Sequence, residues 1–217
     1  MSEISWAWDL VPAAGPDRAG WTDFMAKLLD EWVGEQVAAA RAAWPADATE
    51  AFPFSPGAVG SAVARDLLER ADGLPRNCRL IWGAGFVDDR VRWLPLLVLA
   101  EFREPRPGDS GYLMALVGAE GMPGDVREPH VEYVSTEHGD GVRVLALAED
   151  DEGLHGRVHA ALRLERPDGD VDVLFETRAN GLEQLAVIGA GVEAVMHLIA
   201  ERSTELNLVP SVAGSPA

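Results

Sequence analysis

Large apolar side chains alternate with smaller or polar ones at the start of the chain, as in Ile4-Ser5-Trp6-Ala7-Trp8. A period of two is typical of a strand that buries one face. The pattern predicts a strand over residues 3–11, followed by a turn region rich in proline and glycine.

Two stretches with helical spacing come next. Over residues 22–43, apolar side chains recur every three or four positions and charged side chains occupy the opposite face. This spacing predicts a helix capped by the Thr22 hydroxyl. Ser55 followed by Pro56 supplies a second N-cap and a proline at the first helical position. A second helix is therefore predicted over residues 56–72.

From Arg79 onward the pattern changes to strands. Pro95 lacks a backbone N–H, so it predicts a bulge, an irregular start or an edge position within its strand. The run Arg166-Pro167-Asp168-Gly169-Asp170 has the residue order of a type I turn and predicts a hairpin. The expected strands cover residues 80–87, 91–102, 112–117, 130–137, 142–148, 154–165 and 171–177.

The chain is expected to end in a helix. Asn180 and Glu183 have the spacing of a capping box, and apolar residues then repeat on one face as far as Ile199. Residues 207–217 are expected to fray. Because no repeat or linker interrupts the chain, we predict one α+β domain over residues 1–206. Its mostly antiparallel sheet has about seven to eight strands, flanked by two N-terminal helices and one C-terminal helix.

Composition adds one strong feature, which is charge. The 217 residues include 36 Asp and Glu against 18 Lys and Arg, giving a formal net charge of −18. Phosphate groups would repel such a surface, so we expect no nucleic-acid partner, whereas a basic protein partner would be attracted. The 47% of hydrophobic residues suffices for a buried core and excludes a wholly disordered chain.

The ends and the apolar stretches of the chain bear on its location. The N-terminus lacks the basic and apolar regions of a secretory signal. The longest apolar stretches, residues 93–100 and 185–192, are shorter than the ~20 residues that a membrane-spanning helix requires. We therefore expect a cytoplasmic protein without membrane insertion. The single cysteine, Cys78, allows neither an intramolecular disulfide nor a thiolate zinc site.

Histidine and arginine gather in the predicted strand over residues 154–165. On a strand, His155, Arg157, His159 and Arg163 share one face. The two histidines are then ~13 Å apart, which is too far for one metal ion. We interpret this face as a polar sheet surface, with a cationic and pH-responsive patch for an acidic partner as the alternative.

No motif for catalysis, a cofactor or a metal was found in the sequence. Ser110 lacks the surrounding residues of a nucleophile elbow. The acidic run 149–152 lacks the ligand spacing of a calcium loop, and the glycine-rich stretch 118–124 lacks the Lys-Ser/Thr of a phosphate loop. We predict no catalytic residue, no cofactor and no metal.

Tryptophan is concentrated near the N-terminus, where five of the seven lie within the first 44 residues. Periodicity assigns Trp6, Trp8 and Trp32 to the core. Trp21 and Trp44 lie at the margins of the first predicted helix, where a partly exposed indole can anchor a protein partner.

The C-terminal two-thirds of the chain carries a short strand-to-helix signature. The last strand ends in LFET (174–177), and the chain passes through NGLEQL (180–185) into the terminal helix. In this signature and in element order, residues 78–203 resemble the Mog1/PsbP-like group, some actinobacterial members of which accompany secretion systems. The resemblance implies an antiparallel sheet flanked by helices and a binding or adaptor role without a catalytic centre.

These observations favour a non-enzymatic cytoplasmic protein that binds another protein, as an adaptor, a chaperone-like factor or an immunity-type protein. The alternative is a small-molecule-binding protein or hydrolase whose site is assembled from distant residues on the sheet face, such as His130, His138 or Glu132. Homo-oligomerisation is a third hypothesis. The candidate partner-binding residues are Trp21, Trp44, His155, Arg157, His159 and Arg163.

Overall fold

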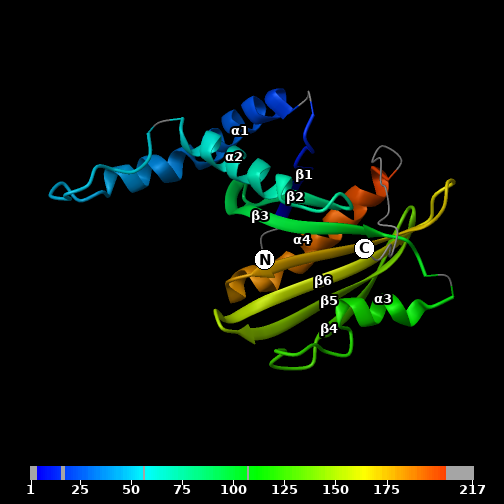
Figure 1. Ribbon diagram of the computed structural model, residues 1–217. Coiled ribbons are helices and arrows are strands. Elements are labelled where there is room, and N and C mark those ends of the chain that lie inside the picture. Colours follow the sequence, from blue (N-terminus) through cyan, green and yellow to red (C-terminus); the bar gives the residue numbers. More distant parts are fainter. Residues whose placement is uncertain (1–3, 16–17, 56, 107, 204–217) are drawn as a thin grey trace, which may run out of the picture.

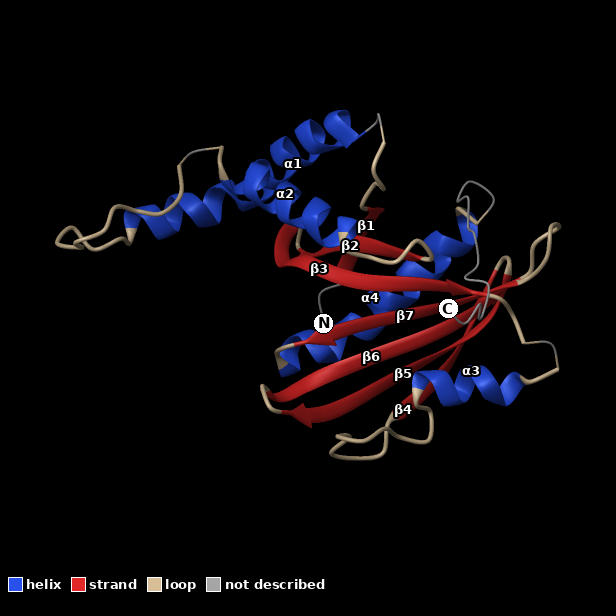
Figure 2. Cartoon of the chain, viewed as in Figure 1, coloured by secondary structure: helices blue, strands red, loops and turns tan. Residues whose placement is uncertain are grey.

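The computed structural model of the protein describes residues 4–15, 18–55, 57–106 and 108–203. In this part of the chain, seven strands form one sheet and four helices pack around it (Figures 1 and 2). The elements are β1 (Ile4–Leu10), α1 (Arg18–Ala42), α2 (Val59–Asp72), β2 (Cys78–Val87), β3 (Arg90–Arg103), α3 (Ser110–Val117), β4 (His130–Thr136), β5 (Gly139–Asp150), β6 (Gly153–Leu164), β7 (Val171–Ala179) and α4 (Leu182–Glu201).

All neighbouring strands are antiparallel, in the order β1-β2-β3-β7-β6-β5-β4. The predicted α+β class with a mostly antiparallel sheet is therefore confirmed. The long connection from β3 through α3 to β4 places β7 in the middle of the sheet. Among the described residues, β7 pairs with β3 over Leu99–Arg103 of β3, and the earlier half of β3 has no strand partner on that side.

Helix α4 covers one face of the sheet and forms the largest core. Alternate β6 residues Val158, Ala160 and Leu162 lie in this core, together with Phe175 of β7. Residues 183–201 are long and apolar enough to cross a membrane, but many of their side chains pack against the sheet. The α4 residues in this core are Ile188, Val192, Val195, Met196, Ile199 and Ala200. Here, α4 is the core helix of the domain.

The other three helices pack on the opposite face, as two separate layers (Figure 2). α1 and α2 cover Leu80 and Trp82 of β2, whereas α3 covers Val144 of β5 and Ala161 of β6. The middle of this face, around β6 and β7, lies between the two layers.

One predicted strand is wrong, because residues 110–117 form helix α3. The Asp109 carboxylate accepts a hydrogen bond from the Tyr112 N–H at 3.0 Å and caps the start of the helix. Gly118, with a φ of 70°, ends it in a left-handed conformation. Leu113 and Val117 then reach the sheet four residues apart. A short, wholly apolar run has no period by which a strand can be distinguished from a helix.

The predicted helix starts are also corrected. α1 begins at Arg18, so Thr22 lies within it and donates its hydroxyl hydrogen to the Arg18 carbonyl at 2.8 Å. At α4 the N-cap is Gly181 without a side-chain cap. The Asn180 side chain instead accepts from Arg178 Nε at 3.2 Å. The assigned part of α2 begins at Val59.

Pro56 and the predicted tail 207–217 lie outside the described residues.

Two local predictions are confirmed. The turn 166–170 joins β6 to β7, with Gly169 at a φ of 123° and its N–H donating to the Arg166 carbonyl. Gly83 of β2 pairs with Leu96 of β3, and Gly85 of β2 pairs with Trp93 of β3. Two residues of β3, one of them Pro95, therefore lie opposite a single residue of β2. The proline therefore lies in a bulge.

Glycines of β2 make room for the N-terminal tryptophans. A Cβ on Gly83 would lie 2.3 Å from the Trp8 ring, and one on Gly85 would lie 2.8 Å from the Trp6 ring. The Trp6 and Trp8 rings stack at 6.0 Å and pack against the core under α4. The core role predicted for these tryptophans is confirmed.

Candidate functional site

The end of α1 and the return loop form a projecting arm, which we define as residues 34–58 (Figure 1). The buried residues of α1 are Met25 and Leu29, in its first half, and nearly every described residue of the arm is exposed. The arm is held at its base, where the Gly60 N–H donates to the Asp30 carboxylate at 2.7 Å. Residues this exposed contribute little to a core.

Three aromatic rings and an arginine pack together near the end of the arm. We call Arg41, Trp44, Phe52 and Phe54 the arm tip. The Phe52 ring lies 5.5 Å from Trp44 and 5.7 Å from Phe54 in edge-to-face geometry. The Arg41 guanidinium lies 4.8 Å over Phe52 and donates to the Phe54 carbonyl. Trp44 Nε1 donates to the Glu50 carbonyl at 3.1 Å.

These contacts fix the aromatic side chains while leaving them accessible. Trp44 is 39% exposed and Phe54 is 48% exposed. The arm carries Glu35, Asp47 and Glu50 against the single base Arg41. The arm tip is therefore an ordered apolar surface in an acidic setting.

The second candidate surface is the sheet face between the two helix layers. His155, Arg157, His159 and Arg163 lie on this face, as their alternation predicts. The arginines are paired. Arg157 Nη2 is 2.8 and 2.7 Å from the two oxygens of Asp125, and Arg163 Nε is 2.8 Å from Asp172. These residues therefore do not form a free cationic patch.

His159 is held neutral by its surroundings. Burial, and to a smaller extent the charge of Arg157, lower the pKa of His159 to about 4 against the opposing effect of Asp125. Arg157 Nη1 lies 3.2 Å from His159 Nδ1. A guanidinium can only donate, so Nδ1 accepts and the neutral ring carries its proton on Nε2.

A cavity of about 340 Å³ opens on this face, and we call it the sheet-face pocket. It lies where β3 separates from β7, since Leu99 is the first β3 residue paired with β7 and its partner is Glu176. The next β7 residue, Thr177, donates its hydroxyl hydrogen to the Leu97 carbonyl at 2.6 Å. The lining residues are Leu99, His155, Arg157, His159, Glu176, Thr177 and Arg178.

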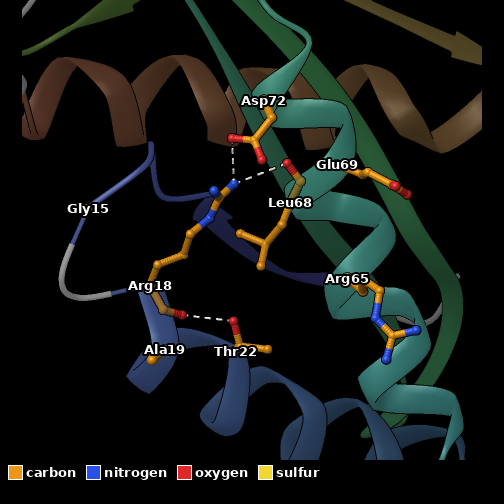
Figure 3. A pocket seen from close by; sticks show the side chains of 8 residues that line it. All are labelled: Gly15, Arg18, Ala19, Thr22, Arg65, Leu68, Glu69 and Asp72. Carbon is orange, nitrogen blue, oxygen red and sulfur yellow. Dashed lines mark hydrogen bonds and ion pairs between the residues drawn. The ribbon is translucent and has the colours of Figure 1, made fainter.

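A larger cavity, of about 480 Å³, lies between the start of α1 and the end of α2 (Figure 3). Arg18 spans it, with Nη2 at 2.8 Å from Asp72 and 3.1 Å from the Leu68 carbonyl. These contacts hold the two helices together, so we interpret this cavity as structural. A third cavity, of about 300 Å³, lies between α3 and β5 and is lined mainly by apolar groups such as Met114 and Val142.

The structure separates the other candidates named from the sequence. Trp21 is half-buried against the core under α1 and α2, with its Nε1 buried and unpaired among the described residues. Glu132 does not line the sheet-face pocket. It forms an ion pair with the buried Arg143. His130 accompanies it, with 3.3 Å between His130 Nε2 and Glu132. His138 lies in the β4–β5 turn.

Several residues of these surfaces were not singled out from the sequence, and four of them matter most for the two surfaces. They are Phe52, Phe54, Asp125 and Glu176. Two phenylalanines around a proline, in an otherwise polar loop, were a signal for the arm tip. Asp125 and Glu176 gave none, because their roles depend on pairings across the sheet.

Among the described residues, no group of three or more His, Cys, Asp or Glu side chains is placed to hold a metal ion. No family model, curated protein or solved structure matches this chain. The Mog1/PsbP-like resemblance therefore stays a prediction.

Proposed function

We propose that this chain is a non-enzymatic, cytoplasmic protein-binding module of the adaptor, chaperone-like or immunity type, and that it docks on a basic partner through the arm tip. The observation that carries the proposal is the ordered aromatic cluster of Trp44, Phe52 and Phe54 on an arm whose residues are not packed into the core.

The residue types of the arm tip and the fixed conformations of their side chains suit binding to a protein. Tryptophan and arginine are enriched among residues that dominate interface energies. Their contacts with Phe52 already restrict the side chains before binding, which reduces the entropy lost on association. Exposed rings held in this way are suited to insertion into an apolar depression on a partner.

Charge indicates the kind of partner. The net charge of −18 and the acids of the arm attract a basic surface and accelerate its approach. A second copy of the chain would be repelled by the same charge. The partner is therefore proposed to be a basic protein with an apolar depression, in preference to another copy.

Affinity capture from the native host tests the proposal. The wild-type chain is expected to retain a basic protein in stoichiometric amount. The double variant Trp44→Ala/Phe54→Ala is expected to lose it, because both anchors are removed. Tyr133→Ala is the matched control, since Tyr133 is 79% exposed on β4 and far from the arm in sequence.

Two results would contradict the proposal. One is retention of the partner by the double variant, which would place the interface elsewhere. The other is a homodimer in sedimentation of the pure protein that the double variant dissociates, because the arm tip would then bind a second copy. Circular dichroism of the variants controls for misfolding.

The sheet-face pocket favours the second candidate function, small-molecule binding, over hydrolysis. Thr177 is the hydroxyl-bearing residue of its lining, and this hydroxyl donates to the Leu97 carbonyl, so it does not stand free as a nucleophile.

A further inference from the structure

The arginines on the sheet face are compensated by nearby carboxylates. Arg157 is paired with Asp125, with only 11% and 6% of their side chains exposed. Arg178 Nη1 lies 2.6 Å from Asp150, and its Nη2 lies 3.3 Å from Glu152. Neither guanidinium is left to attract an anionic ligand.

Glu176 is the uncompensated charge of the pocket. Its side chain is exposed, and within the described part of the chain it has no hydrogen-bond or ion-pair partner. The segments outside that part contain no Lys, Arg or His. The pocket therefore presents a net negative charge to a ligand.

The neighbouring His159 does not compensate the negative charge of Glu176. His159 lies directly across from Glu176 in the β6–β7 register. Its low pKa, near 4, follows from burial and leaves the ring neutral at pH 7. On the other side, β3 contributes the apolar side chain of Leu99. An acceptor carboxylate beside an apolar wall suits a cation that carries an alkyl chain.

We propose that the sheet-face pocket binds an alkylammonium or alkylguanidinium group, with the Glu176 carboxylate as its counter-ion and Leu99 against its alkyl chain. A volume of about 340 Å³ is sufficient for a small organic cation. The group can belong to a free amine or to a lysine or arginine side chain of a protein. This site goes beyond the protein-binding proposal and does not depend on it, because a free probe tests it directly.

The test uses n-butylammonium and n-butylguanidinium as probes, with n-butanol as the neutral control, at pH 7 and low salt. Side-chain NMR signals of the 5 histidines report binding. We expect saturable shifts for His155 and His159 with both cations and none with n-butanol.

Variants then test the role of Glu176. Glu176→Gln keeps the shape but removes the charge, and it is expected to weaken cation binding about tenfold. Glu176→Lys places a tethered cation in the pocket and is expected to abolish binding. Glu165→Gln is the matched control, because Glu165 is an exposed acid directly after the end of β6, and this variant is expected to bind as the wild type does.

A competition experiment identifies the source of the cation. A short peptide with one lysine that displaces n-butylammonium supports a protein side chain, and failure of the peptide to displace a bound probe supports a free amine. The proposal is overturned if neither cation gives saturable shifts, if n-butanol binds equally well, or if Glu176→Gln and Glu165→Gln behave alike.

Discussion

At the scale of single residues, the effect of a charged side chain on the sheet face depends on the partner with which it pairs. Arg157 and Arg163 look like part of a basic face in the sequence, and the fold adds Arg178 opposite Arg157, yet each of the three pairs with an aspartate from another segment. Arg157 and Asp125 are the most buried of these pairs. Their interaction therefore affects stability more than an exposed ion pair does.

Removal of Asp125 tests this pair. Asp125→Ala leaves the Arg157 guanidinium buried without its carboxylate, and we expect the free energy of unfolding to fall by about 3 kcal/mol. Urea denaturation measures this change. Asp168→Ala is the control, because Asp168 is 67% exposed and pairs with Arg166, and its cost should stay below about 1 kcal/mol. Equal costs for the two variants would refute the interpretation.

The depressed pKa of His159 predicts a pH dependence of stability. Its value of about 4 in the folded state lies below the ordinary 6.5, so the unfolded chain binds more protons between these values. This contribution to stability is complete above pH 6.5 and is lost as the pH falls toward 4. Carboxylates with a lowered pKa, such as Glu132, change the stability only at a pH near or below their ordinary pKa of 4.5.

His159→Gln should therefore flatten the dependence of unfolding free energy on pH between 6.5 and 4.5. Urea denaturation at a series of pH values measures the slope. An unchanged slope in the variant would show that another group titrates in this range. NMR titration of the His159 ring provides the direct check.

At the scale of elements, close approach decides where β1 and β2 can pair. Gly83 of β2 lies under the Trp8 ring, and a Cβ there would also lie 2.5 Å from the Ala7 carbonyl oxygen. The backbone oxygen cannot move away without disturbing the β1–β2 pairing. The tryptophan-rich edge of the sheet thus depends on a small residue in the neighbouring strand.

Gly83→Ala is expected to destabilise the fold by about 2 kcal/mol, because the added methyl group overpacks this contact. Gly34→Ala is the matched control. Gly34 lies in α1 with no atom near the added Cβ, so alanine should be neutral or stabilising by up to about 1 kcal/mol. Thermal and urea denaturation measure both. Tolerance of alanine at position 83 would contradict the close packing.

At the scale of the whole molecule, the arm leaves and rejoins the rest of the protein at one place. Gly57 lies near Asp30, with 3.8 Å between a Cβ built on Gly57 and the Asp30 carboxylate, and Gly60 bonds to the same carboxylate. The chain therefore leaves and rejoins the body of the protein within about one turn of α1. Most of the core lies beyond this point, in the sheet and α4.

Excision of residues 35–56, with a short glycine linker joining Gly34 to Gly57, should leave the sheet folded. We expect the far-ultraviolet dichroism to lose helix, while cooperative thermal unfolding and the histidine NMR shifts with n-butylammonium persist. Capture of the protein partner should be lost. Loss of cooperative unfolding would show that the arm supports the core.

Patterns of neighbouring residues in the sequence determined most helices and strands of this protein. Period-two and helical spacing predicted β1 and the long helices, and the residues of the 166–170 turn predicted the β6–β7 hairpin, because these signals depend on neighbours along the chain. The run 112–117 was mistaken for a strand because its helix is fixed by the cap at Asp109 and by the sheet beneath it.

Only the tertiary structure decided which residues meet. Asp125 reaches Arg157 across 32 positions of sequence, and Leu99 lies beside Glu176 because β7 is inserted next to β3. The net charge of −18 was evident from composition, but its distribution was not. Pairing in the folded chain neutralised the arginines and left Glu176 without a partner among the described residues, since the energy of a charge depends on distances that only the fold sets.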